Sequence, residues 1–466
     1  MLLRGRAFAS FSCSSTASNA DCQYLERSSE PTDKFQSQLP LLPIPELHDT
    51  CARYLDALRP LILNQAQFHD TERHVETFER NCGKQLDHEL RKRSADISDR
   101  TYFFDDWLDM YLTHRPPLPI NMNPYYIIRD DPQPEMNLPA LRATNLIVSS
   151  LRYWRSLRDR VLAPEKIEMR PFQNIFSTTR IPRPKRDEIK YFEQSRHVVL
   201  LRHGQFYAFD VVDEQGNLKL PEEIASFVHS VNAIPVPEPH SEESICTLSA
   251  DDRDSWAAAR DHLESLTSDN RKNFYKIDSA LLLVCLDSEP YDPIELSTQS
   301  LAFLHGCYRP EELPGSNGRF RLNRWFDKSV QLIITHRGVA GLNFEHSWAD
   351  GVILQSAFNK IYEDSVKNRF QKKLPTSTVD VSQNRLSFTM DERTRQNLDS
   401  ANRKFRQFAA SVQMTVVEYE DMNRQYLKSR HISPDFVFQM AFQMANYKLF
   451  THPGKHENDA NFTPFR

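Results

Sequence analysis

The sequence contains no long run of apolar residues. The longest, about Leu281 to Leu286, is far shorter than the roughly 20 residues that a membrane-spanning helix needs. Hydrophobic residues make up 39% of the 466-residue chain and charged residues 26%, which is ordinary for a globular protein. The sequence therefore predicts no membrane-spanning helix, although contact with a membrane surface stays open.

Clustered cysteines and an excess of basic charge are also missing. The seven cysteines are scattered, with no Cys-x-x-Cys pair and no His/Cys cluster at zinc spacing. We therefore expect reduced thiols and no metal site. With 58 Lys and Arg against 63 Asp and Glu, the net charge is −5. This balance argues against a general nucleic-acid-binding protein.

Acidic side chains are absent from the first twenty residues. Met1 to Ala20 contains Arg4, Arg6 and several serines, and the first carboxylate is Asp21. This composition is typical of a mitochondrial presequence, and its apolar part is too interrupted for a secretory signal. We expect residues 1–21 to be a mitochondrial transit peptide, with a disordered polar tail as the alternative.

A histidine follows two apolar runs in the second half of the chain. Val330 to Ile334 and Val339 to Phe344 are separated by the polar step Thr335 to Gly338, which predicts a hairpin. His346 then falls in a loop before a helical run, four positions ahead of Asp350. Such a histidine can act as a general base, and the carboxylate can hold its ring in one tautomer. By spacing alone, a surface ion pair or a satisfied core histidine is the commoner case.

The remaining elements are predicted from hydrophobic periodicity and capping signals. Trp107 and Tyr111, four residues apart, can share one face of a helix. Ser433 is expected to cap a last helix that Pro434 opens. We expect helices near 75–90, 147–161, 254–266, 352–362 and 390–430, a hairpin of 197–202 with 206–212, and a buried strand at 280–286. We expect Tyr54, Leu55 and Leu58 to be buried. Val352 is expected on the same helix side as Leu354 and Ile361, and the apolar side of the last helix is expected to hold Phe436, Met440 and residues 442–444.

The surroundings of His346 resemble the signature of the choline/carnitine acyltransferase family. The matching residues are Arg324-Trp325-Phe326-Asp327-Lys328, the two predicted strands, Glu345-His346 and Asp350-Gly351, whereas Arg337 departs from the family pattern. Residues 39–50 resemble a second signature of the same family, and residues 181–187 match a third segment. Separate motifs in the same order are stronger evidence than any one of them.

The resemblance implies an α/β fold like that of the chloramphenicol-acetyltransferase-like, coenzyme-A-dependent acyltransferases. In that fold two related halves enclose the active site in a tunnel. The resemblance covers about residues 22–448 and implies an N-terminal acyltransferase domain at 22–375. The start of a second, incomplete acyltransferase domain with a coenzyme A-binding region is expected at 376–448, followed by a divergent tail at 449–466.

The resemblance also implies a reaction, in which a long-chain acyl group moves between carnitine and coenzyme A for mitochondrial fatty acid β-oxidation. Both molecules are substrates, and no cofactor or metal is expected. His346 would be the general base and Asp350 would orient it, while Trp107 and Tyr111 would contact carnitine. The implied coenzyme A-binding residues are Arg424, Lys428, Ser433 and Asp435. The expected location is the matrix or the matrix side of the inner membrane, with possible peripheral membrane contact. The alternative is an inactive truncated isoform, or an incomplete gene model, that acts at most as a binding protein.

Overall fold

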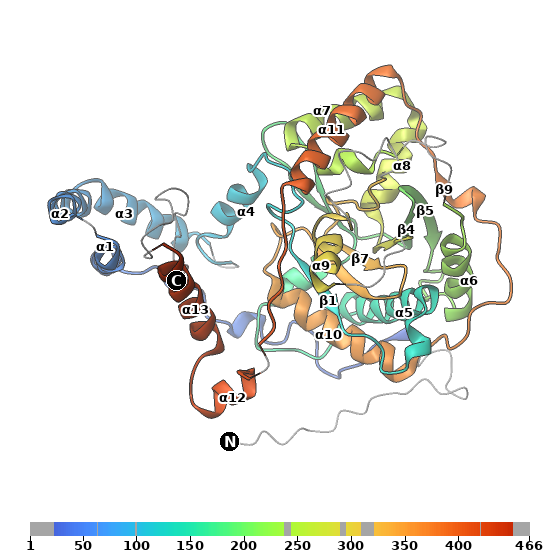
Figure 1. Cartoon of the computed structure of the whole chain (residues 1–466), viewed down its shortest axis with the longest axis horizontal. Coiled ribbons are helices and arrows are strands. Elements are labelled where there is room, and N and C mark those ends of the chain that lie inside the picture. Colours follow the sequence, from blue (N-terminus) through green and yellow to red (C-terminus); the bar gives the residue numbers. More distant parts are fainter. Residues whose placement is uncertain are drawn as a thin grey trace. The chain divides into compact units, whose positions relative to one another are not determined.

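The computed structural model describes residues 23–62, 64–97, 100–236, 244–288, 295–308, 321–419 and 421–450. The expected transit peptide, and the tail from residue 451 onward, lie outside the described residues. The chain divides into two compact units, one ending at Gln413 and the other beginning at Met414 (Figure 1). The boundary expected after residue 375 falls inside the first unit, and the assignment of two acyltransferase domains stays a prediction.

A mixed sheet forms the centre of the first unit. Among the described residues it has seven strands in the order β1-β8-β7-β6-β4-β5-β9. Strand β6 runs parallel to both of its neighbours, β4 and β7, and the other pairs are antiparallel. The strands are β1 (Tyr125–Ile128), β4 (His197–Arg202), β5 (Gln205–Asp210), β6 (Leu283–Leu286), β7 (Val330–Ile334), β8 (Ala340–Phe344) and β9 (Arg385–Leu386). A separate two-stranded sheet pairs β2 (Thr178–Ile181) with β3 (Glu188–Tyr191).

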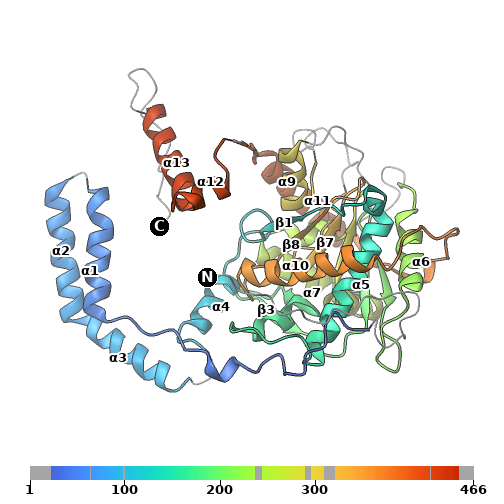
Figure 2. The ribbon, with the colours of Figure 1, turned by 90° about the horizontal axis from the view of Figure 1, so that it is seen from below.

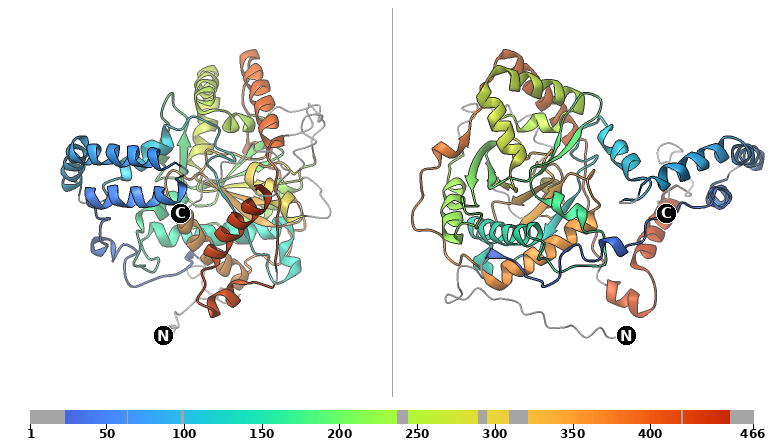
Figure 3. Two further views of the ribbon diagram at one scale, coloured as in Figure 1. Left: turned by 60° about the vertical axis from the view of Figure 1, so that its left-hand side comes forward. Right: turned by 180° about the vertical axis from the view of Figure 1, so that it is seen from behind.

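Helices cover both faces of the large sheet (Figures 1 and 3). Side chains alternate between the two faces along each strand. In β4, Val198 and Leu200 belong to one core cluster, whereas Val199 and Leu201 belong to the other. The central strands are apolar at consecutive positions because both of their faces are buried. The first core contains residues of α5 (Pro139–Arg158), α6 (Pro221–Asn232) and α10 (Gly351–Asn368), and the second contains residues of α7 (Arg253–Leu266), α8 (Ser268–Ser279), α9 (Leu296–His305) and α11 (Glu392–Ala410).

The two predicted hairpins are confirmed. Strands β7 and β8 pair antiparallel, and Gly338 in their turn has a φ of 82°. A Cβ atom at this position would lie 1.5 Å from the carbonyl oxygen of Asn137, so only glycine fits. Strands β4 and β5 form the second hairpin through His203 and Gly204. The mixed α/β class is also as expected, whereas the chloramphenicol-acetyltransferase-like architecture stays a prediction.

One expected helix limit and one expected position on a helix face are wrong. The expected helix near 390–430 ends at Ala410, and α12 (Arg424–Ser429) begins only after an irregular segment. The β-branched residues Thr415, Val416 and Val417 in that segment disfavour a helix. In α10, Val352 is 68% exposed because Leu354, Ala357 and Ile361 supply the buried face.

The N-terminal helices are more exposed than the sequence predicts. They are α1 (Leu47–Leu58), α2 (Gln65–Arg80) and α3 (Cys82–Ala95), and each contacts the other two. Tyr54 in α1 is 51% exposed, contrary to the expectation, and Leu55 and Leu58 are only partly buried. A three-helix arrangement of this size offers little surface against which to bury a full apolar face (Figure 2).

The second unit contains α12 and α13 (Pro434–Phe450) in its described part. Ser433 caps α13 as predicted, since its hydroxyl accepts a hydrogen bond from the backbone N–H of Phe436 at 3.4 Å. The apolar residues expected on one side of α13 are largely exposed: Phe436, Phe442 and Met444 are 58%, 57% and 56% exposed. In the described part of the chain, no helix combines the length and the apolar content needed to cross a membrane.

Candidate active site

His346 lies in the loop that joins β8 to α10, as predicted. The loop is held on the sheet side, where the backbone N–H of Glu345 donates to the carbonyl oxygen of Ser329 at 3.1 Å. On the helix side Asp350 caps α10, with its Oδ1 atom accepting from the backbone N–H of Gly351 at 2.7 Å. The imidazole is 21% exposed between these two anchors. Its position therefore follows from the end of a buried strand and the start of a capped helix.

The short helix α4 (Phe104–Leu112) places two aromatic side chains on this loop. The hydroxyl of Tyr111 lies 3.0 Å from Nδ1 of His346, and the two ring centroids are 5.5 Å apart. The indole Nε1 of Trp107 donates to the carbonyl oxygen of Ser347 at 3.2 Å. Trp107 and Tyr111 contact each other at a centroid distance of 4.9 Å, so they share one helix face. Their role in carnitine binding stays a prediction.

The two nitrogen atoms of His346 have different surroundings. Nδ1 has the Tyr111 hydroxyl as its partner, whereas Nε2 lies 3.6 Å from Oδ1 of Asp350. The second distance exceeds that of a hydrogen bond, and the Asp350 side chain is 76% exposed. A tyrosine hydroxyl can accept a hydrogen bond from Nδ1–H, which leaves the lone pair of Nε2 free to take a proton. The orienting role expected for Asp350 stays a prediction, and Tyr111 is a closer partner that the sequence does not reveal.

Tyr111 keeps its proton at ordinary pH. Burial raises the pKa of its phenol, and the negative charges of Asp350 and Glu345 raise it further. The neutral hydroxyl is therefore the species that meets the imidazole.

A buried arginine links α4 to the histidine loop. Arg180, in β2, donates from one terminal nitrogen to Oε1 of Glu345 at 2.9 Å and from the other to the carbonyl oxygen of Tyr111 at 2.7 Å. Glu345 also accepts from the hydroxyl of Ser347 at 2.6 Å. The side chains of Arg180 and Glu345 are fully buried. One guanidinium group thus holds both Glu345, which precedes His346, and the backbone carbonyl of Tyr111, and Glu345 in turn holds Ser347, which follows His346.

The network extends behind the site through alternating charges. Asp187 accepts from Nε of Arg180 and from Nε of Arg253, each at 2.7 Å. Arg253 also pairs with Asp327 at 2.6 Å, and Trp256 donates to the same carboxylate. Burial alone would raise the pKa of Asp187, but the charges of Arg253 and Arg180 outweigh it and hold the pKa below its usual value. Asp327 of the signature segment therefore acts in the scaffold behind the site.

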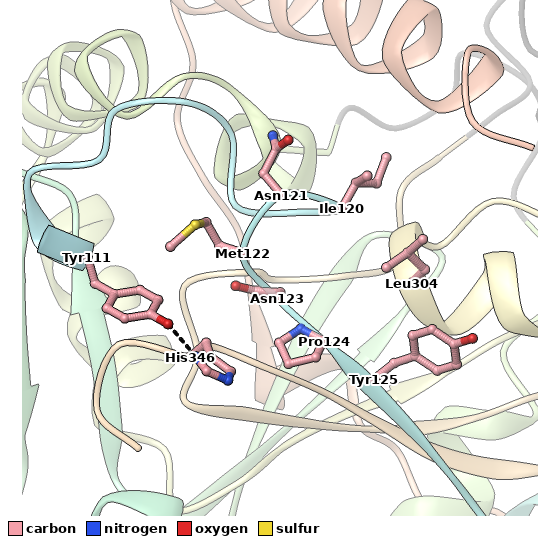
Figure 4. A pocket seen from close by; sticks show the side chains of 9 residues that line it. All are labelled: Tyr111, Ile120, Asn121, Met122, Asn123, Pro124, Tyr125, Leu304 and His346. Carbon is pink, nitrogen blue, oxygen red and sulfur yellow. Dashed lines mark hydrogen bonds between the residues drawn. The ribbon is translucent and has the colours of Figure 1, made fainter. Parts of the chain in front are cut away.

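A cavity of about 470 Å³ opens beside the Tyr111–His346 pair (Figure 4). Its wall is formed mainly by the segment that leads into β1. The lining residues are Tyr111, Ile120, Asn121, Met122, Asn123, Pro124, Tyr125, Leu304 and His346. A small organic group can therefore reach the imidazole from this side.

The expected coenzyme A-binding residues belong to the second unit. Arg424 and Lys428 lie one turn apart on α12, and both are exposed. Ser433 and Asp435 are exposed at the start of α13. Their position allows contact with a ligand in solution, and their role stays a prediction.

Comparisons with known proteins agree with the motifs around this site. The family model for choline/carnitine O-acyltransferases matches residues 42–466. The mitochondrial carnitine O-palmitoyltransferase 2 of Xenopus tropicalis is 34% identical, with 95% of this chain and 69% of that protein covered. For the enzyme of Homo sapiens the identity is also 34%, with 92% and 68% covered. The peroxisomal carnitine O-octanoyltransferase of Bos taurus is 29% identical, with 93% and 71% covered. The chain belongs to the choline/carnitine O-acyltransferase family and is an acyltransferase.

Proposed function

We propose that the chain moves a long-chain acyl group between carnitine and coenzyme A, with His346 as the general base. The observation that carries the proposal is the imidazole held by Tyr111 at the edge of the cavity, 3.0 Å from the phenol hydroxyl. Support for a long acyl chain comes from the palmitoyltransferases, which are 34% identical, against 29% for the octanoyltransferase. The enzyme acts in mitochondrial β-oxidation, in the matrix or on the matrix side of the inner membrane. The fold follows the chloramphenicol-acetyltransferase-like architecture of coenzyme-A-dependent acyltransferases.

The proton moves through Nε2 of His346. In the forward direction Nε2 removes the proton of the carnitine hydroxyl while the oxygen attacks the thioester carbonyl carbon. The carbon–sulfur bond then breaks, and the proton on Nε2 passes to the sulfur of coenzyme A. Nδ1–H donates to Tyr111 throughout, and the carboxylate of Asp350 stabilises the imidazolium across its 3.6 Å separation. The reverse direction follows the same atoms.

Two groups of side chains bind the substrates in this proposal. Trp107 and Tyr111 offer aromatic faces, which attract the quaternary ammonium group of carnitine. Arg424 and Lys428 bind phosphate groups of coenzyme A by charge, with Ser433 and Asp435 at the adjoining helix start.

The test is carnitine-dependent release of free thiol from palmitoyl-coenzyme A by the purified chain. We expect release with carnitine and only the hydrolytic background without it. Octanoyl-coenzyme A is the matched donor, and a lower kcat/KM is expected for it. A faster octanoyl reaction would contradict the long-chain assignment. A folded chain that binds coenzyme A without any turnover would favour the alternative of a non-catalytic binding protein.

A further inference from the structure

A buried side-chain oxygen in the cavity wall has no partner. Asn123, just before β1, is 1% exposed, and its Oδ1 atom accepts no hydrogen bond within the described part of the chain. In Figure 4 this oxygen points toward the side of the cavity where Tyr111 and His346 lie. Buried polar atoms in native proteins almost always have a partner, so an orphan beside a candidate base calls for an explanation.

The amide group of Asn123 is fixed in this orientation. Its Nδ2 atom donates to the carbonyl oxygen of Phe326 at 2.9 Å and to Oδ1 of Asn343 at 3.2 Å. Both hydrogens of the NH₂ group are therefore used. A flipped amide would place its oxygen against two other oxygens and would lose both bonds.

The acceptor role of Asn343 is fixed in turn. Its own Nδ2 donates to the carbonyl oxygens of Phe303 and Leu304, at 3.1 Å each. Its Oδ1 also accepts from Nε2 of Gln331 at 3.2 Å. The chain of amides thus has one direction, and it ends with a lone acceptor that faces the cavity.

The chemistry of this acceptor restricts its ligand. A neutral carbonyl oxygen binds an N–H or O–H donor and repels the thioester oxygen and the carboxylate of carnitine. The proton of the carnitine hydroxyl goes to His346 in the reaction proposed above, on which this inference rests. The donor that remains near the reacting sulfur is the amide N–H of the pantetheine arm, two carbon atoms from the sulfur. We infer that Oδ1 of Asn123 binds this N–H group and so positions the sulfur beside His346.

The first experiment changes the ligand and leaves the protein intact. Binding of coenzyme A to the full chain is compared, by calorimetry, with binding of an analogue in which an ester replaces the amide nearest the sulfur. Loss of one hydrogen bond to a buried acceptor predicts about tenfold to a hundredfold weaker binding of the ester. Equal affinities would overturn the inference.

The second experiment changes the acceptor. In Asn123→Leu we expect the ratio of the two affinities to fall to about one. This ratio does not depend on the folded fraction of the sample, so partial unfolding of the variant cannot mimic the effect. Asn121→Leu is the matched control, because Asn121 lines the same cavity but is exposed and donates to the carbonyl oxygen of Pro117. The control should keep the wild-type ratio.

Other outcomes separate the inference from the proposed function. An unchanged ratio in Asn123→Leu, together with weaker carnitine binding, would identify the carnitine hydroxyl as the donor and overturn the inference alone. A wild-type chain that binds coenzyme A and turns it over, but does not distinguish the ester, also overturns the inference alone. A wild-type chain that does not bind coenzyme A overturns both.

Discussion

At the scale of single residues, the site depends on which group holds each nitrogen of His346. The sequence places a carboxylate four positions away and suggests Asp350 as the orienting group. In the structure the nearer partner is Tyr111, from a helix more than two hundred positions earlier in the chain. Sequence spacing could not reveal this contact, because it depends on how α4 packs against the loop. Within the sequence, only the family resemblance points to Trp107 and Tyr111 as candidates for carnitine binding.

We predict that Tyr111→Phe lowers kcat/KM by about tenfold to a hundredfold, since a hydrogen bond to an imidazolium is lost while the ring contacts remain. The measurement is steady-state transfer from palmitoyl-coenzyme A at several pH values. Tyr126→Phe is the matched control, because this ring stacks on Phe344 near the site but has no hydrogen bond to His346. Equal rates for Tyr111→Phe and the wild type would contradict the orienting role of the phenol.

The buried amino group of Lys328 should make the free energy of unfolding depend on pH. Burial lowers the pKa of its amino group to about 7, and Nζ donates to the carbonyl oxygen of Asp278 at 2.6 Å. The unfolded chain, with its ordinary lysine pKa of 10.5, binds more protons than the folded chain between these two values. The contribution to the free energy of unfolding therefore rises from pH 7 toward pH 10.5, by at most about 1.4 kcal/mol per pH unit.

Urea unfolding at pH 7 and pH 9 measures this effect. The free energy of unfolding of Lys328→Met should rise less between the two pH values than that of the wild type. Equal rises in both proteins would show that Lys328 titrates normally in the folded state.

At the scale of elements, buried ion pairs and tight turns hold the site together. Arg180 joins β2, α4 and the histidine loop, and the β7–β8 turn fits against the segment before α5. The hairpin itself could be predicted, because two apolar runs separated by a short polar stretch are visible in the local sequence. The role of Arg180 could not, because the side chains that it joins lie far apart in the sequence.

We predict that Arg180→Leu lowers the free energy of unfolding by about 3–5 kcal/mol, because Glu345 and Asp187 lose a buried partner. The matched control is Arg183→Leu, three residues away, where the ion pair with Glu188 is about half exposed on both sides. Its effect should stay below about 1 kcal/mol. Urea denaturation measures both, and similar effects in the two variants would contradict the proposed link.

Gly338 and Gly216 form a second matched pair, since both have a φ of 82°. A Cβ atom at Gly338 would collide with Asn137, whereas one at Gly216 would meet nothing within 4 Å. We expect Gly216→Ala to lower the free energy of unfolding by about 1–2 kcal/mol, because alanine disfavours the left-handed backbone conformation. Gly338→Ala should lower it clearly more, because its Cβ atom would also collide with Asn137. Thermal unfolding compares the two, and equal costs would mean that the turn moves away from Asn137 freely.

At the scale of the whole molecule, features that depend on local sequence patterns could be predicted, whereas features that depend on packing between distant residues could not. Both hairpins and the position of His346 follow from periodicity and turn residues, whereas the α/β class follows from the family resemblance. The exposed faces of Tyr54 and Phe436 were not predicted, because a helical pattern indicates an apolar face but not whether another element covers it. The lone acceptor of Asn123 could not be predicted either, since its orientation depends on Asn343 and Phe326.

The central claim is that His346 is the base of acyl transfer to carnitine. The most direct measurement compares carnitine-dependent thiol release by His346→Ala with that by His336→Ala, an exposed histidine in the β7–β8 turn. We predict a loss of about 10²- to 10⁴-fold in the first variant and wild-type activity in the second, with both proteins folded. Substantial activity in a folded His346→Ala chain would contradict the account, because another group would then have to accept the proton.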